Sequence, residues 1–266
     1  MSRRAEDITR WADAIEAALP SIDACCVSKV LVYDKVSSTQ DAAWRHRLPG
    51  KGVVVVSSVQ TAGRGQRGRR WDDGFGLTLP VSFALSTAMD DVGLAARAGL
   101  AALDACCAAA PTADLRIKWP NDIVWRTNGL DRKLAGVLVE RRDGVAVVGV
   151  GINVFRVDHD TVCARPPRAG CLEDIGGNTD RCRLAIGLVR SFSRWLGTPD
   201  DGVRMHWRER DAMVGTRRAF VCDGTDIEGE VLALDPLASI VVRTASGERS
   251  LAVATTRTAD AVRADA

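Results

Sequence analysis

The order of apolar and polar positions along this chain predicts a mixture of helices and strands. Apolar residues recur at helical spacing over residues 5–19, and an Ala-rich helix is predicted over 93–110, where Pro111 stops it. Residues 121–132, with the turn signal Asn128-Gly129, are interpreted as a connection. Runs of β-branched and other apolar residues predict strands at 30–36, 52–58, 77–85, 115–119, 133–141 and 145–154. The remaining predicted helices are 41–47, 183–196 and 203–213.

The pattern changes after residue 213, where the predicted elements become short strands. Turn residues such as Asp223-Gly224 and Ser246-Gly247 separate these strands, as a small barrel requires. The short strands are predicted at 218–222, 228–233, 239–244 and 248–253. We therefore predict two domains, a larger one over 1–213 and a small β domain over 214–266.

Composition and charge exclude several classes of protein. Of the 266 residues, 46% are hydrophobic and 26% are charged, which is ordinary for a globular protein and unlike disordered, collagen-like or coiled-coil chains. A net charge of +2 is too small to indicate binding to nucleic acid or to a membrane surface. No apolar run reaches the roughly 18 residues of a membrane-spanning helix, and the first residues are amphipathic, unlike a signal peptide. We therefore expect a cytoplasmic location.

The eight cysteines do not have the spacing of a metal or disulfide framework. Cys25-Cys26 and Cys106-Cys107 are adjacent, and no C-x-x-C motif occurs. A zinc site built from His159, Cys163 and Cys171 is an alternative interpretation. The interpretation we favour is that reduced cysteines act as small apolar residues.

The most informative pattern lies in the predicted loop Gly63–Trp71, which reads GRGQRGRRW. Its glycines permit positive φ angles and close approach of the backbone, so that exposed N–H groups can surround an anion. Its arginines are planar and permanently charged, which suits carboxylates and phosphates. By itself the loop also fits a solvated basic segment or an RNA-binding patch, and it lacks the spacing of a P-loop.

Three other stretches bring chemically useful residues to predicted strands. Lys118–Asp122 places a cation close to an Asn and to an Asp that can hold Mg²⁺, although the same residues also fit a plain strand end and turn. Lys133–Glu140 is an apolar strand that begins with a lysine. Gly149–Asn153 is a strand with two glycines that ends at an amide, which is weak evidence by itself.

Taken together, these stretches resemble the motifs of the biotin protein ligases. Ser38-Thr39-Gln40, Gln60–Gly65, Lys118–Asp122, Lys133–Glu140 and Gly149–Asn153 match that family in order and spacing. The resemblance implies an α+β fold, with a mixed central β-sheet and helices packed on one face as in class II synthetases, followed by a small SH3-like β-barrel. It also implies two half-reactions. Biotin and MgATP form biotinyl-5′-AMP and pyrophosphate, and biotin then passes to a specific lysine of a carrier protein.

The resemblance also implies the site residues. Lys133 and Arg64 are the expected catalytic residues, because both would hold the biotin carboxylate and the α-phosphate. The residues implied to bind biotin are Ser38, Thr39, Gln40, Gln60, Thr61, Gly63, Arg64, Gly65, Gln66, Trp71, Lys133 and Gly136. Those implied to bind ATP are Arg67, Arg69, Trp71, Lys118, Asn121, Asp122, Lys133 and Asn153, with Asp122 as the candidate Mg²⁺ ligand through ATP.

The implied cofactors are ATP and Mg²⁺, with biotin as the substrate. The implied partner is the biotin carboxyl carrier protein of acetyl-CoA carboxylase or of a related biotin-dependent carboxylase. We expect a monomer or a weak homodimer that binds neither nucleic acid nor a membrane. Two positions depart from the family pattern: Gln40 stands where the family often has Asn, and Gln66 stands where many members have Arg.

Three alternatives share part of the resemblance. Lipoate–protein ligases have the same fold and adenylation chemistry, but their loop has the motif Arg-Arg-x-Ser-Gly-Gly-Gly, which is absent from this sequence. A biotin-responsive repressor carries a winged helix in front of the enzyme, for which the residues before Val30 are too few. A non-catalytic biotin-binding module is the third alternative, and the presence of Arg64 and Lys133 argues against it.

Overall fold

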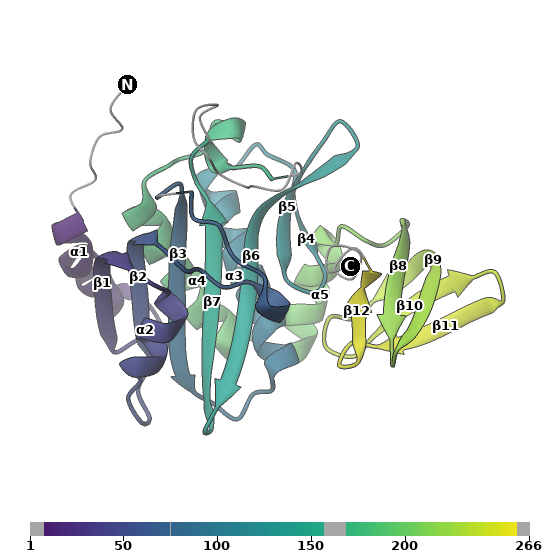
Figure 1. The fold of residues 1–266 in the computed structure, drawn as a ribbon, viewed down its shortest axis with the longest axis horizontal. Coiled ribbons are helices and arrows are strands. Elements are labelled where there is room, and N and C mark those ends of the chain that lie inside the picture. The colour runs from purple at the N-terminus through teal and green to yellow at the C-terminus, as the bar shows by residue number, and fades with distance from the viewer. Residues whose placement is uncertain (1–7, 75, 157–168, 260–266) are drawn as a thin grey trace.

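The computed structural model describes residues 8–74, 76–156 and 169–259. Within these residues, a seven-stranded sheet has the order β1-β2-β3-β7-β6-β5-β4 (Figure 1). Strands β1 and β2 are parallel, and the other neighbouring pairs of this sheet are antiparallel. The strands are β1 (Lys29–Val36), β2 (Val53–Gln60), β3 (Thr78–Ser86), β4 (Leu115–Lys118), β5 (Asp122–Thr127), β6 (Leu130–Arg142) and β7 (Val145–Asn153). The predicted mixed sheet is confirmed.

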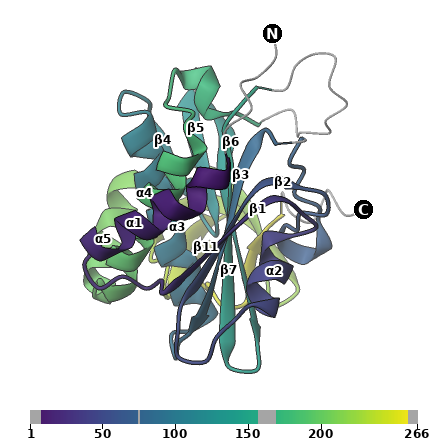
Figure 2. The ribbon, with the colours of Figure 1, turned by 90° about the vertical axis from the view of Figure 1, so that its left-hand side faces the viewer.

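Longer helices cover one face of this sheet, as predicted, and a short helix lies on the opposite face (Figure 2). Those on the covered face are α1 (Trp11–Ala18), α3 (Asp91–Ala109), α4 (Arg181–Gly197) and α5 (Asp200–Arg210), and the short helix is α2 (Thr39–Arg45). By length and composition alone, helix α3 could cross a membrane, but 67% of its most apolar 18-residue stretch is buried inside the protein. It is therefore the central core helix of this fold.

The middle strands present different residues to the two faces, because side chains alternate along a strand. Toward the four longer helices they present large apolar residues such as Phe83 and Ile152, which belong to the main core. Toward α2 they present smaller residues such as Ala84 and Val147, which pack with Ala43 of that helix. The face that carries α2 therefore leaves space above the sheet.

The C-terminal strands form a separate antiparallel sheet with the order β11-β10-β9-β8-β12. Its strands are β8 (Arg217–Cys222), β9 (Thr225–Leu234), β10 (Ser239–Thr244), β11 (Gly247–Ala252) and β12 (Thr256–Thr258). Phe220, Val231, Ile240 and Val242 of this sheet are buried and belong to the same contiguous core as the main sheet. The predicted C-terminal β-sheet is confirmed, but it does not close into the expected barrel, because in the described residues β11 pairs only with β10 and β12 pairs only with β8.

Three elements differ from the sequence-based predictions. Strand β5 occupies part of the stretch 121–132, where polar residues flank a short apolar core, and β12 is too short to produce a pattern. Helix α5 ends at Arg210 rather than at residue 213. The reason is Asp211, whose carboxylate accepts the backbone N–H groups of Met213 and Val214 at 2.6 Å each.

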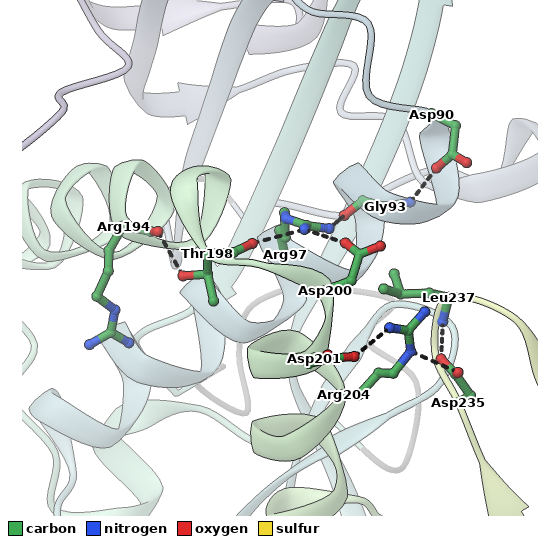
Figure 3. A network of polar contacts seen from close by, with 10 residues as sticks. All are labelled: Asp90, Gly93, Arg97, Arg194, Thr198, Asp200, Asp201, Arg204, Asp235 and Leu237. Atoms are coloured by element: carbon green, nitrogen blue, oxygen red, sulfur yellow. Dashed lines mark hydrogen bonds and ion pairs between the residues drawn. The ribbon is translucent and has the colours of Figure 1, made fainter.

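A network of ion pairs joins the helical layer to the second sheet (Figure 3). Arg97 of α3 donates to the Asp200 carboxylate at 2.7 Å and to the Thr198 carbonyl at 3.0 Å. One helix turn further along α5, the guanidinium of Arg204 contacts the carboxylate of Asp235, in the β9–β10 turn, at 2.9 Å. These contacts fix the second sheet against α5.

Candidate active site

A cavity of about 750 Å³ lies beside α2, on the face of the main sheet against which this helix packs. Its walls come from α2, from the loop 61–72, from β3, β6 and β7, and from the segment 118–122. Sequence-predicted residues that line it are Thr39, Gln40, Gln60, Arg64, Gly65, Gln66, Arg69, Trp71, Lys118, Asn121, Asp122, Lys133, Gly136 and Asn153. The structure thus brings together most of the residues that the motifs implied.

Among the described side chains, the other predicted residues do not line this cavity. Ser38 is buried directly before α2, and its hydroxyl has no hydrogen-bond partner among the described residues. Thr61 is exposed, and its carbonyl accepts a hydrogen bond from Arg70 at 2.9 Å. Gly63 lies in the stem of the loop, and the side chain of Arg67 falls outside the described part of the structure.

The loop closes on itself through its backbone. The N–H of Trp71 donates to the Gly63 carbonyl at 2.9 Å, and the N–H of Gly65 donates to the Arg69 carbonyl at 2.7 Å. A Cβ atom at Gly63 would lie 2.6 Å from the Trp71 carbonyl oxygen, so this close approach requires glycine. Of the two reasons that the sequence suggested for glycine in this loop, a positive φ angle and close approach of the backbone, only close approach applies to Gly63.

The Trp71 ring packs against two glycines of the sheet. A Cβ at Gly151 would lie 2.5 Å from the ring, and one at Gly136 would lie 3.2 Å from it. These glycines are direct neighbours across β6 and β7. Two adjacent glycines therefore make the space for this indole, whose Nε1 is buried without a hydrogen-bond partner in the described residues.

At one end of the cavity, hydroxyl and amide groups form a connected set. The Gln60 side-chain oxygen accepts hydrogen bonds from the Thr39 N–H at 2.7 Å and from the Thr39 hydroxyl at 3.0 Å. The Ser82 hydroxyl donates to the Thr39 hydroxyl at 2.9 Å. These contacts fix the orientation of the Gln60 amide, so that its NH₂ group remains as a donor.

Gln40 adds an acceptor to the same region. Its NH₂ group donates to Glu140 at 3.0 Å and to the Val147 carbonyl at 3.4 Å. Its oxygen is therefore the free end, and it is buried without a hydrogen-bond partner among the described residues. Gly149 makes room for this longer amide, since a Cβ there would lie 2.8 Å from the Gln40 oxygen.

The cationic part of the cavity is centred on Lys133, at the start of the apolar part of β6. Its ammonium nitrogen lies 2.6 Å from a carboxylate oxygen of Asp122 and 5.5 Å from the centre of the Trp71 ring. The amide nitrogen of Asn153 donates to the carbonyls of Lys133 and Gly170. Asn153 thus holds the backbone that carries Lys133, and its amide oxygen is the group left for a ligand.

Asn121 has a similar arrangement, because its amide nitrogen donates to the Val137 carbonyl at 2.6 Å. Its neighbour Asp122 supplies one carboxylate, and no cluster of three metal-ligating side chains is found in the described residues. A single carboxylate beside amide oxygens fits a Mg²⁺ ion whose other ligands are phosphate oxygens and water. The donor set therefore suits a magnesium ion that arrives with a nucleotide.

The seven cysteines of the described ranges form no disulfide with one another. Cys163 and His159, two members of the alternative zinc site, fall outside those ranges, so that interpretation stays untested.

Arg64 lies between two carboxylates that the sequence analysis did not select. One terminal nitrogen forms a short ion pair with Asp41 of α2, and the other lies 2.8 Å from Glu140 of β6. Burial lowers the pKa of the Arg64 guanidinium, but the hydrogen bonds with Asp41 and Glu140 outweigh burial and raise that pKa above its ordinary value. Arg64 therefore remains charged.

A buried carboxylate fixes the far end of the loop. Asp73 accepts hydrogen bonds from the N–H groups of Gln60 and Gly76, at 3.0 Å each, and from the Thr78 hydroxyl. Burial raises the pKa of Asp73 above its ordinary value of 3.8, although these hydrogen bonds and the charge of Arg181 oppose the shift.

The sequence analysis missed Asp41, Glu140 and Ser82 as members of this region. Ser82 had a usable signal, because it is one of only two polar residues, with Thr78, in the predicted strand 77–85. Asp41 and Glu140 had none, because they lie 23 and 76 residues from Arg64 along the chain.

Comparisons with known proteins show the family and the fold of this chain. Residues 32–155 match the model of the biotin/lipoate A/B protein ligase family. The structure also resembles a biotin protein ligase from Aquifex aeolicus solved with biotin and ATP, with a TM-score of 0.73 over 87% of this chain and 98% of that one. At 21% identity, this likeness shows the fold.

Curated relatives are more similar in sequence. A biotin–[acetyl-CoA-carboxylase] ligase of Mycobacterium tuberculosis is 32% identical over 200 residues, covering 69% of this chain and 70% of that protein. The enzyme of the same name from Paracoccus denitrificans is 31% identical over 218 residues, covering 75% of this chain and 88% of that protein. By fold, motifs and these relatives, the chain belongs to the biotin protein ligases of the biotin/lipoate A/B protein ligase family.

Proposed function

We propose that this chain is an ATP-dependent biotin–[biotin carboxyl carrier protein] ligase. A biotin carboxylate oxygen attacks the α-phosphorus of ATP, the bond to pyrophosphate breaks, and biotinyl-5′-AMP forms. A carrier lysine amine then attacks the acyl carbon, loses a proton, and displaces AMP. The ligase activity follows from the curated relatives, and the carrier named here is our proposal.

One observation supports this chemistry above the others: a single cavity joins a set of fixed amides and hydroxyls to a lysine beside an indole. Biotin has a ureido ring with two donors and one acceptor, which matches the free Gln60 NH₂ and the free Gln40 oxygen. Its ring and tail are apolar and suit contact with Trp71. Its carboxylate then approaches the cationic part of the cavity around Lys133.

Lys133 is the residue to which we assign the central role. Two anions, the biotin carboxylate and the α-phosphate, must approach each other, and one ammonium group between them reduces their repulsion. For this role, the ammonium group of Lys133 must break its ion pair with Asp122, which lies 2.6 Å away in this structure. Asp122 is then free to interact with Mg²⁺, which would balance charge on the departing pyrophosphate. Arg69 and Lys118 line the same cavity and supply further positive charge toward the phosphates.

We further propose that the acceptor is the carrier domain of a biotin-dependent carboxylase and that the reaction occurs in the cytoplasm. ATP as a substrate fits an intracellular compartment, and the absence of disulfides among the cysteines of the described residues fits a reducing one. We propose residues 1–213 as the catalytic unit and 214–266 as the domain that closes its nucleotide side, where Thr258 lines the cavity.

The test is incubation of the purified chain with biotin, MgATP and a purified biotin carboxyl carrier domain. We expect ATP-dependent pyrophosphate release and addition of one biotin to the carrier, measured by mass spectrometry. The matched lysine controls are Lys133→Ala, which should lose both products, and Lys51→Ala, an exposed site outside the cavity, which should keep them. Biotin binding without pyrophosphate release would instead identify a non-catalytic binding module, and labelling with lipoate instead of biotin would identify a lipoate ligase.

A further inference from the structure

The side chain of Arg64, in the arginine-rich loop, is already engaged in two ion pairs in this structure. Its terminal nitrogens each contact a different carboxylate, Asp41 on α2 and Glu140 on β6. Glu140 also accepts the Gln40 amide at 3.0 Å through the same carboxylate oxygen. The guanidinium therefore connects the loop to a helix and to a central strand.

The charges in this cluster argue against a simple anion-binding role for Arg64. Two carboxylates surround one guanidinium, so Asp41, Arg64 and Glu140 together carry a net charge of about −1 at neutral pH. A biotin carboxylate that approached Arg64 would meet both of them and would have to displace one. Lys133 faces a single carboxylate, and its cluster with Asp122 is neutral.

The positions of the carboxylates suggest what the cluster does. Both stand on regular elements, whereas Arg64 stands on a loop that closes through backbone contacts between residues 63 and 71. Arg64 is adjacent to Gly63, where the loop leaves β2 and meets Trp71. Holding Arg64 therefore holds the stem that places Trp71 over its two glycines.

We propose that Asp41 and Glu140 form a carboxylate latch for Arg64, which fixes the loop 63–71 over the biotin cavity, so that Arg64 acts as a positioning residue while Lys133 takes the biotin carboxylate. This inference rests on the proposed function, because it assigns roles within the biotin site. It replaces, for Arg64, the carboxylate-holding role that the family resemblance implies.

The latch and the anion-holding role predict opposite signs for the same substitutions. If Asp41 and Glu140 hold Arg64 in place, Asp41→Asn and Glu140→Gln loosen the loop and weaken ligand binding. If Arg64 instead binds the biotin carboxylate, these substitutions remove competing negative charge and strengthen binding. Both changes keep the size of the side chain, so packing is preserved.

The experiment is calorimetric titration with biotin and with biotinol, the analogue whose carboxylate is replaced by an alcohol. For Asp41→Asn, Glu140→Gln and Arg64→Ala, we expect affinity for both ligands to fall together, by about two- to fivefold for these half-exposed pairs. Lys133→Ala should instead lose affinity for biotin and keep it for biotinol. The matched control is Asp91→Asn, which removes a half-exposed ion pair with Arg141, the residue next to Glu140 on β6, and should change neither affinity.

A kinetic measurement separates positioning from loss of fold. In Asp41→Asn and Glu140→Gln, biotinyl-adenylate should dissociate about two- to fivefold faster, with a raised KM for biotin and a kcat within about twofold of wild type, while thermal melting matches that of Asp91→Asn. Tighter biotin binding in the carboxylate variants, or loss of biotin affinity in Arg64→Ala with biotinol affinity retained, would overturn the latch. If the wild-type chain binds neither ligand, it is the proposed function that fails.

Discussion

The two faces of the seven-stranded sheet are built from the same strands, but one face forms the hydrophobic core and the other lines the cavity. On one face, Phe83 of β3 and Val148 of β7 are cross-strand partners buried in the main core under the longer helices. On the other, their sequence neighbours Ser82 and Gly149 are also partners, and both line the cavity. Adjacent residues of one strand therefore have different roles, because one packs in the core and the next lines the binding cavity.

This difference teaches where a sheet can place a binding site. The core face excludes water with large apolar side chains, and each contributes roughly 1.5–3 kcal/mol when buried. The cavity face has glycines at Gly136, Gly149 and Gly151, and the space they leave is taken by Trp71 and Gln40. With glycines at these positions, the cavity face buries less apolar surface than the core face, and it leaves room for a ligand.

The largest effect is expected from Lys133→Ala on the cavity side. Loss of its charge-assisted contacts with the biotin carboxylate and the α-phosphate should cost about 3 kcal/mol, roughly a hundredfold in the rate of adenylate formation at subsaturating biotin. Pyrophosphate release measures this rate, and circular dichroism checks the fold. A rate within about threefold of wild type would show that Lys133 does not have this role.

A neighbouring pair on β7 tests the comparison directly. Gly151→Ala places a methyl group 2.5 Å from the Trp71 ring, which must move. Returning the displaced indole to the position that biotin contacts would then cost about 2 kcal/mol, so biotin affinity should fall roughly thirtyfold. Unfolding by urea should show little change, since the displaced indole belongs to the cavity wall. Unchanged biotin affinity would mean that Trp71 does not shape the site.

The matched substitution on the core side is Ile152→Val, one residue further along β7. Ile152 is fully buried in the main core and does not line the cavity. Removing one methylene should lower the free energy of unfolding by about 1 kcal/mol. Biotin affinity should stay within twofold of wild type. If Ile152→Val weakened binding as much as Gly151→Ala, the two faces would not be separate in function.

The smallest effect concerns pH and the buried carboxyl that fixes the end of the loop. Burial raises the pKa of Asp73, so the folded chain holds this proton more tightly than the unfolded chain. Its contribution to stability is fully present below the unfolded pKa of about 3.8 and is lost as the pH rises through the raised value. The unfolding free energy of wild type minus that of Asp73→Asn should therefore fall between about pH 4 and neutrality. A difference that rises over this range would contradict the assignment.

Much of the fold could be predicted from the sequence, because long apolar runs such as 77–85 and 145–154 signal buried strands without further context. Strand β5 could not, since its pattern depends on the partners β4 and β6 that surround it.

The site divides in the same way. Its glycines, lysines and Gln60 stand in local motifs, which is why the sequence indicated them. The partners of Arg64 are set by the approach of α2 and β6, and the pairing of Lys133 with Asp122 by the register of β5 against β6. Such long-range contacts leave no mark in a single sequence.

The most direct test of the account is a crystal structure of the chain grown with biotin and ATP. We predict density for biotinyl-5′-AMP in the cavity, with the ureido ring near Thr39 and Gln60, the chain of biotin against Trp71, and the phosphate near Lys133. Ligand bound elsewhere, or bound here with Lys133 still paired to Asp122 and away from the phosphate, would contradict it.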